Sequence, residues 1–277
     1  MDIKLVAIDL DDTLLNSRSK ISKTTKSILK KISSKDIIII LATGRMPNRT
    51  EPFVDMINID CPIIVYNGAM LRDRRNKGRK ILFHKPLQSA FSDIVINYCQ
   101  KHNFCLNFYL DDVLYSQKNP AVKRFQHLYS KRTGARYILV DDLRIFLGKK
   151  PTKLILITDS VAGEKFRTRD YQFTYFLKAF GDRVRLFRTD PEYLEIQHKN
   201  TNKAVALDIY ATKYGINKKQ IMAFGNGEND IAMLRYAGIS IAVNNASEIV
   251  KKHADIVAKW TNEEDGVAKI LKQYILD

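Results

Sequence analysis

"LVAIDLDDTLLNS", residues 5–17, joins an apolar run to three aspartates within four positions, Asp9, Asp11 and Asp12. Carboxylates this close together repel one another and are poorly solvated when buried, so a fold rarely gathers them without a cation or a phosphoryl group to use them. Asp12 alone is explained equally well as a turn former or a helix cap. The stretch therefore predicts a buried strand that ends in carboxylates with a chemical task.

Apolar runs alternate with helical patterns in both flanking parts of the chain. The runs lie at 4–10, 37–43, 62–68, 220–226, 239–245 and 254–259. Between the first two, Ile28, Leu29 and Ile32 recur at helical spacing behind Ser19 or Ser22 as N-cap. Continuous β-branched runs that alternate with helices are typical of a parallel sheet covered on both faces. We expect an α/β fold with a doubly wound parallel sheet.

The middle of the chain has a different pattern, more mixed and more aromatic. Its candidate elements are three strands and two helices, at 104–116, 153–159, 184–190, 86–102 and 162–180. This pattern predicts a small α+β domain, residues 85–188, inserted between residues 1–84 and residues 189–277 of the doubly wound domain. The aromatic run also offers Tyr109, Asp111 and Tyr115 as substrate contacts, although aromatic alternation more often means a packed strand face.

The composition is that of a globular protein, with 45% hydrophobic and 27% charged residues in a chain of 277. The apolar run 37–42 is far too short to span a bilayer. Asp2, Lys4 and Asp9 interrupt the region where a signal peptide would need continuous apolar residues. We therefore expect a cytoplasmic protein without a membrane partner.

The cysteines and the charge bear on compartment and partners. Cys61, Cys99 and Cys105 form no CxxC or Cys/His cluster, which indicates reduced thiols. The net charge of +16 raises the local concentration of phosphates and nucleic acids. No helix-turn-helix, zinc-finger or RNP-like pattern accompanies this charge. We expect a solvated, lysine-rich surface and no nucleic-acid partner.

Polar residues follow four of the predicted strands. Asp9 and Asp11 follow the first, Thr43 the second, Asn67 and Gly68 the third, and "GNGEND" (225–230) the fourth. Each group alone has a plain explanation as a turn, a cap or a surface loop. The carboxyl ends of parallel strands meet at one edge of a sheet, where ligands bind. The joint pattern therefore predicts one active site at this edge.

These residues carry a family resemblance. "DLDDTLL", "LATGR", "YNGAM", "YLEI…NKAVAL" and "FGNGENDIAML" resemble, in this order, the motifs of the Cof-type branch of haloacid dehalogenase-like (HAD) phosphatases. "AVNNASEIVKKHADIV" and "EDGVAKIL" continue the likeness toward the C-terminus. The resemblance implies a HAD-like core with residues 85–188 as an α+β cap of the C2 type. The cap segment matches in size and position more than in specific residues.

The resemblance also implies a Mg²⁺-dependent phosphatase that acts on small phosphorylated metabolites, with sugar phosphates as the leading class. Asp9 would attack phosphorus to form an aspartyl-phosphate, and Asp11 would serve as general acid and base. The implied catalytic residues are Asp9, Asp11, Thr43 and Lys203. The implied phosphate or substrate contacts are Leu10, Thr43, Gly44, Arg45, Lys203 and Asn229. The implied metal ligands are Asp9, the backbone carbonyl of Asp11, Asn226 and Asp230.

One residue departs from the family pattern, which has aspartate directly after the glycine where this chain has Asn226. An amide oxygen can bind Mg²⁺, but the change removes one negative charge from the site. Two alternatives to a phosphatase therefore stay open. One is a weakened scaffold that binds a phosphate ligand or nucleic acid, and the other is a phosphomutase or phosphotransferase that uses the same aspartyl-phosphate.

Overall fold

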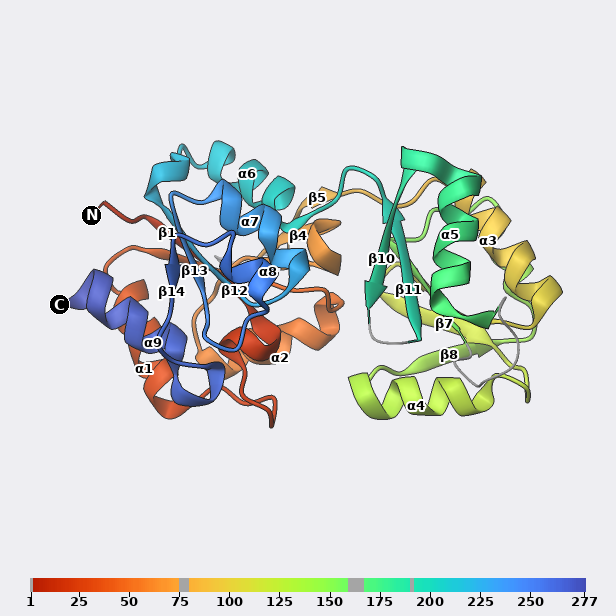
Figure 1. Ribbon diagram of the computed structural model, residues 1–277, viewed down its shortest axis with the longest axis horizontal. Helices are drawn as coiled ribbons and strands as arrows, with labels where there is room; N and C mark the ends of the chain where they lie inside the picture. Colours follow the sequence, from red (N-terminus) through yellow and green to blue (C-terminus); the bar gives the residue numbers. More distant parts are fainter. Residues whose placement is uncertain (1, 75–79, 159–166, 190–191) are drawn as a thin grey trace. The chain divides into compact units, whose positions relative to one another are not determined.

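The computed structural model describes residues 2–74, 80–158, 167–189 and 192–277, which form two compact units (Figure 1). The first unit contains Met1–His84 and Asn202–Asp277, and the second contains Lys85–Thr201. The predicted boundary at 188 is therefore placed too early. Strand β11 (Tyr193–His198) pairs with its neighbours in the sheet of the second unit, so the "YLEI" motif belongs there and not to the first unit.

The first unit is built on an eight-stranded sheet with the order β14-β13-β12-β1-β2-β3-β4-β5. The strands are β1 Leu5–Asp9, β2 Ile38–Ala42, β3 Ile63–Val65, β4 Met70–Asp73, β5 Lys80–His84, β12 Ile221–Gly225, β13 Ile239–Ala242 and β14 Ile256–Val257. Neighbouring strands from β14 to β3 are parallel, while β4 and β5 pair antiparallel at one end. The predicted parallel sheet is confirmed.

Helices cover both faces of this sheet, which explains why all five residues of β1 are buried. Helices α6 (Lys203–Lys213) and α7 (Ile231–Tyr236) lie on one face, with α1 (Lys23–Ser33) and α9 (Gly266–Leu271) on the other (Figure 1). The remaining helices of this unit are α2 Pro47–Ile57 and α8 Glu248–Lys251. The arrangement is the doubly wound α/β fold expected from the alternating runs.

Helix α1 shows how the local sequence defines an element. The side chain of Ser22 accepts a hydrogen bond of 2.9 Å from the backbone N–H of Thr25 and so caps the first turn. Ile28, Leu29 and Ile32 are buried, as their spacing predicts. Of the two predicted caps, Ser22 is therefore the one that the helix uses.

The second unit has a six-stranded sheet with the order β10-β11-β9-β6-β7-β8. Its elements are α3 Ser89–His102, β6 Cys105–Leu110, β7 Val113–Gln117, α4 Lys123–Thr133, β8 Tyr137–Val140, β9 Lys153–Ile157, α5 Arg169–Phe180, β10 Val184–Thr189 and β11. All of its strand pairs are antiparallel except β7 with β8. The mixed α+β character agrees with the prediction, and residues 162–166 of the second predicted helix lie outside the described residues.

The aromatic run of the second unit is a packed strand face. The hydroxyl of Tyr109, a side chain that is 3% exposed, lies 2.6 Å from the hydroxyl of Tyr129. The ring of Tyr115 packs 4.7 Å from the ring of Phe146, centroid to centroid. These contacts favour the packing explanation of this stretch over direct substrate contact.

Cys61, Cys99 and Cys105 are buried free thiols. In the part of the chain that the structure describes, each helix is too short or too polar to cross a membrane.

Candidate active site

The predicted residues meet at the carboxyl edge of the first unit's sheet. Asp9 ends β1, Thr43 follows β2, Asn67 follows β3, and Asn226 follows β12. These four strands are neighbours in the order β12-β1-β2-β3 and run parallel. Their ends therefore lie at one edge, as the sequence predicts.

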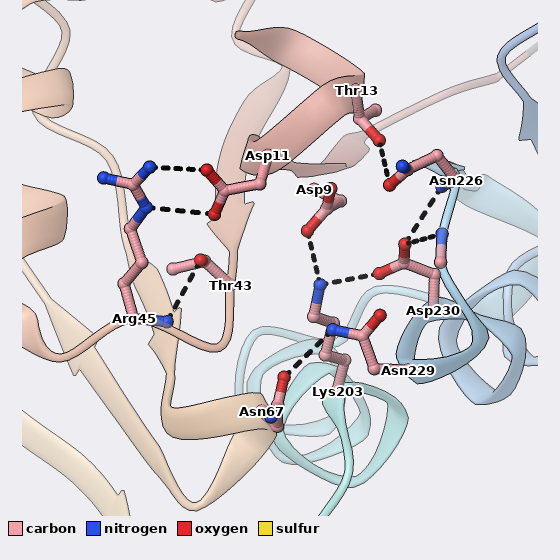
Figure 2. Close-up of polar contacts among 11 residues, drawn as sticks. Asp9, Asp11, Thr13, Thr43, Arg45, Asn67, Lys203, Asn226, Asn229 and Asp230 are labelled. Atoms are coloured by element: carbon pink, nitrogen blue, oxygen red, sulfur yellow. Dashed lines mark hydrogen bonds and ion pairs between the residues drawn. The ribbon is translucent and has the colours of Figure 1, made fainter. Parts of the chain in front are cut away.

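A buried ion-pair cluster forms the centre of the site (Figure 2). The Lys203 ammonium donates a hydrogen bond of 2.6 Å to one oxygen of Asp9 and another of 2.6 Å to one oxygen of Asp230. Lys203 and Asp230 are fully buried, and Asp9 is 4% exposed. No described residue hydrogen bonds to the second oxygen of Asp9, which is thus available to a ligand.

The position of Lys203 depends on a close approach between two loops. Lys203 is the first residue of α6, and Asn202 caps this helix by accepting a hydrogen bond of 2.9 Å from the N–H of Val205. Gly68, with φ of +94°, packs against this cap, and a Cβ there would lie 2.0 Å from the carbonyl oxygen of Asn202. Only glycine allows this approach, which brings Lys203 beneath the strand ends.

The cluster holds two buried carboxylates and one ammonium. Burial raises the pKa of Asp9 to about 7, with a further contribution from the neighbouring Asp230, although the Lys203 ammonium opposes the shift. Burial disfavours the charged form of Lys203 too, but the carboxylates of Asp230 and Asp9 outweigh it and raise the pKa of Lys203 above its usual value. The cluster therefore has one carboxylate in excess, and a further cation would stabilise Asp9 in its ionised form.

Asp230 supports the loop that follows β12. One of its oxygens bonds Lys203, and the other accepts hydrogen bonds from the backbone N–H groups of Asn226 (3.0 Å) and Gly227 (2.9 Å). Gly225 makes room for it, because a Cβ there would lie 2.5 Å from the Cβ of Asp230. These contacts favour a supporting role for Asp230 over the metal-ligand role that the resemblance implies.

The remaining donors suit a divalent cation that prefers oxygen. They are the Asp9 carboxylate, the backbone carbonyl of Asp11 and the amide oxygen of Asn226. The amide oxygen of Asn226 accepts a hydrogen bond of 3.0 Å from Thr13 and keeps a second lone pair for a metal. Clusters of three or more His, Cys, Asp or Glu side chains that could hold a metal do not occur among the described residues, so the fit depends on this mixed set.

The loops after β2 and β3 are tied together beside this cluster. Thr43 is fully buried, and its hydroxyl accepts a hydrogen bond of 3.2 Å from the backbone N–H of Arg45. The N–H of Asn67 donates to the carbonyl of Thr43 at 3.0 Å. A Cβ on Gly44 would lie 2.9 Å from the side-chain oxygen of Asn67, so a larger residue there would push that side chain aside.

Asn67 is a site residue to which sequence reasoning gave no role. Its side-chain oxygen accepts a hydrogen bond of 3.0 Å from the amide of Asn229, one of the predicted phosphate contacts. Tyr66 and Asn67 have φ of 52° and 53°, a left-handed pair uncommon outside glycine. The place of Asn67 at a strand end was the available signal. Thr13, the partner of Asn226, was not predicted either, although it directly follows Asp12.

The structure does not place the side chains of Arg45 and Leu10 as simple phosphate contacts. The guanidinium of Arg45 forms a two-pronged pair with the carboxylate of Asp11, its Nε lying 2.9 Å from one oxygen (Figure 2). The resemblance implies a substrate contact for Arg45, whereas the structure shows its guanidinium in an ion pair with Asp11. The side chain of Leu10 is fully buried, so any contact of this residue with phosphate comes from its backbone.

Comparisons with known proteins identify the family of the chain. The family model for haloacid dehalogenase-like hydrolases matches residues 6–271. A Bacillus subtilis protein, 5-amino-6-(5-phospho-D-ribitylamino)uracil phosphatase YcsE, is 27% identical over 276 residues, which cover 100% of this chain and 97% of that protein.

Two solved structures resemble the whole chain. The crystal structure of TM0651 from Thermotoga maritima has a TM-score of 0.86 and 30% identity and covers 99% of this chain and 98% of its own. BT1666 from Bacteroides thetaiotaomicron, studied among phosphatases of the same superfamily, has a TM-score of 0.79 and 25% identity over 98% of this chain and 94% of its own.

Proposed function

Because the chain belongs to the haloacid dehalogenase-like hydrolase family and is a phosphatase of that family, we propose that it is a Mg²⁺-dependent enzyme that hydrolyses small phosphate esters through an aspartyl-phosphate on Asp9. One observation carries the proposal. The Asp9 carboxylate, nearly buried at the end of β1, uses one oxygen to bind Lys203 and leaves the other for phosphorus. A carboxylate held in this way is an oriented nucleophile.

The first step forms a bond between the free oxygen of Asp9 and phosphorus and breaks the bond from phosphorus to the leaving oxygen. Asp11 donates a proton to that oxygen, so that a neutral alcohol leaves. In the second step Asp11 takes a proton from water, the water oxygen bonds to phosphorus, and the bond to Asp9 breaks. The products are inorganic phosphate and the original carboxylate of Asp9.

The transferring phosphoryl oxygens need positive charge and hydrogen-bond donors. Lys203, the hydroxyl of Thr43, the N–H of Gly44 and the amide of Asn229 are the candidates at this edge of the sheet. Mg²⁺ held by Asp9, the carbonyl of Asp11 and Asn226 would supply the remaining positive charge. The Lys203 ammonium meanwhile orients Asp9.

The relatives support a proposal for the substrate class. The name of the Bacillus subtilis relative describes a phosphatase of a phosphoribityl compound, which makes a phosphorylated sugar or sugar alcohol our first candidate. We place the reaction in the cytoplasm, where buried free thiols are stable. The role of residues 85–201 as a cap that selects the leaving group stays a prediction.

The test measures phosphate release from 5-amino-6-(5-phospho-D-ribitylamino)uracil, a panel of sugar phosphates and p-nitrophenyl phosphate in the presence of Mg²⁺. Asp9→Asn should abolish release from every substrate, whereas Asp36→Asn, a change at an exposed aspartate of the same unit, should not. Mass spectrometry of the quenched wild type should detect one added phosphoryl group on Asp9. Full turnover by Asp9→Asn would exclude the proposal.

A phosphate-binding protein on a weakened scaffold is the second candidate, and Asn226 is the observation that favours it. Its amide carries no charge and already accepts a hydrogen bond from Thr13. Release of phosphate only by Asn226→Asp, with none by the wild type on any substrate, would support this candidate. Transfer of the phosphoryl group to a sugar hydroxyl in preference to water would instead indicate a phosphotransferase.

A further inference from the structure

We infer that Arg45 is a positioning residue for Asp11, which holds the carboxylate of the general acid and base in one orientation. The inference rests on the proposed function and concerns how the same site is held. The guanidinium donates from Nε to one oxygen of Asp11 at 2.9 Å and from a terminal nitrogen to the other oxygen. Two parallel bonds fix the plane of a carboxylate as well as its distance, which a single bond does not.

Arg45 is itself firmly anchored. Its N–H donates to the hydroxyl of Thr43 at 3.2 Å, and its carbonyl accepts a hydrogen bond of 2.9 Å from the N–H of Tyr66. The guanidinium also lies over the ring of Phe53, 5.1 Å from the centroid. The arginine is therefore held by the loops after β2 and β3 and by helix α2.

Among the described residues, Arg45 provides the side-chain contacts that the Asp11 carboxylate makes. It lies in an irregular turn, Leu10–Leu14, where its backbone is extended and Asp12 has a φ of 56°. Its side chain is 49% exposed, against 23% for Arg45. In Figure 2 the Asp11 carboxylate points toward Arg45, while the Asp9 carboxylate points toward Lys203. The orientation of Asp11 thus depends on the arginine.

Arg45 lies beside Thr43, where it could bind the substrate or position Asp11. The two roles predict different kinetics. A residue that binds substrate affects every phosphate ester alike, whether or not Asp11 is intact. A residue that positions the general acid matters most where the leaving oxygen needs a proton. An alkyl phosphate releases an alkoxide that must be protonated, whereas p-nitrophenyl phosphate releases a stable phenolate.

The experiment compares Arg45→Met, Asp11→Asn and the double variant on a sugar phosphate and on p-nitrophenyl phosphate. Asp11→Asn retains the backbone carbonyl and changes only the side chain. We expect Arg45→Met to lower kcat for the sugar phosphate by about 10²-fold, the lower end for general acid–base catalysis, with a much smaller loss for p-nitrophenyl phosphate. The double variant should be no slower than Asp11→Asn, and Arg45→Lys should recover part of the loss.

Equal losses on both substrates, or a further loss when Arg45→Met is added to Asp11→Asn, would overturn the inference. Arg235→Met serves as the control, because Arg235 is an exposed arginine of the same unit that contacts His253. It should leave both rates unchanged.

A second measurement is independent of turnover. The denaturation midpoints of the same variants should be non-additive, since either single change already breaks the pair. Additive midpoints would overturn the inference even in an active enzyme. Non-additive midpoints in a protein without turnover would support the pairing and count against the proposed function alone.

Discussion

Lys203 and Asp230 form an ion pair of 2.6 Å in which neither side chain is exposed to solvent. Asp9 shares the same ammonium at 2.6 Å, so one cation compensates two buried carboxylates. This shared ammonium ties the stability of the fold to the arrangement of the candidate site at the carboxyl edge of the sheet.

Replacing Lys203 by methionine should destabilise the protein by about 3–5 kcal/mol, because it leaves buried charge without a partner. Chemical denaturation at pH 7 measures the effect. The matched control is Lys213→Met at the exposed end of the same helix, which should change stability by less than about 0.5 kcal/mol. Equal stability of the two variants would contradict the structural account of the cluster.

Asp9→Asn should stabilise the metal-free protein at neutral and alkaline pH. Since the folded pKa of Asp9 is raised to about 7, the folded state holds this proton more tightly than the unfolded chain. The stability that this bound proton adds to the folded state is fully present below the pKa of Asp9 in the unfolded chain, near 3.9. It is lost as pH rises through about 7.

The difference in the free energy of unfolding between Asp9→Asn and the wild type should therefore be small near pH 4. It should grow up to about pH 7, by about 1.4 kcal/mol at most for each unit by which the pKa is raised. Denaturation curves in EDTA across this range measure it. A difference that does not vary with pH would show that Asp9 has no raised pKa in the folded protein.

Gly68→Ala should destabilise the first unit by about 3 kcal/mol or more, because its Cβ would meet the carbonyl of Asn202 and a positive φ is unfavourable for alanine. The matched control is Gly215→Ala in the same unit. Gly215 also has a positive φ, of +64°, but a Cβ there meets nothing within 4 Å. The control should lose only the stability that a positive φ costs alanine, about 1–2 kcal/mol. Equal losses would mean that the approach to Asn202 is not tight.

Asn226→Asp should bind Mg²⁺ at least about tenfold more tightly, since an added negative charge beside a divalent cation contributes several kcal/mol even at an effective dielectric constant near 20. Calorimetric titration of the protein with Mg²⁺ measures the change without any substrate. Asn217→Asp is the control, because Asn217 precedes β12 and so belongs to the opposite edge of the sheet. A Kd unchanged in Asn226→Asp would remove Asn226 from the metal site.

The local sequence was sufficient to predict the parallel strands of the first unit, β1, β2, β3, β12, β13 and β14, and the edge at which the candidate site lies. It did not predict β4, β5, β8 or β11, and it gave β6 and β7 as one run. Each of the parallel strands is a short apolar run whose burial does not depend on its exact partner, and polar residues directly after such runs reach the carboxyl edge in any parallel order. The buried face of α1 followed in the same way from helical spacing, which left both Ser19 and Ser22 open as the cap. The family resemblance added roles that spacing alone does not supply.

Other features were beyond the sequence because they join residues far apart in the chain. The hydrogen bond from Thr13 to Asn226 spans 213 positions, and the one from Asn229 to Asn67 spans 162. The pairing of β11 with β9 and β10 similarly placed the end of the second unit at Thr201. Such contacts depend on which strands become neighbours in a sheet, which the pattern within one strand does not encode.

The sequence by itself therefore determined which residues reach the edge of the sheet, because periodicity and strand ends are local properties of the chain. Only the tertiary structure decided what each of them does there. Asp230 supports a loop and Lys203, and Arg45 holds Asp11, because folding brings their charges within hydrogen-bonding distance. The role of a buried charged side chain depends on the groups that it contacts in place of water, and those groups come from distant parts of the chain.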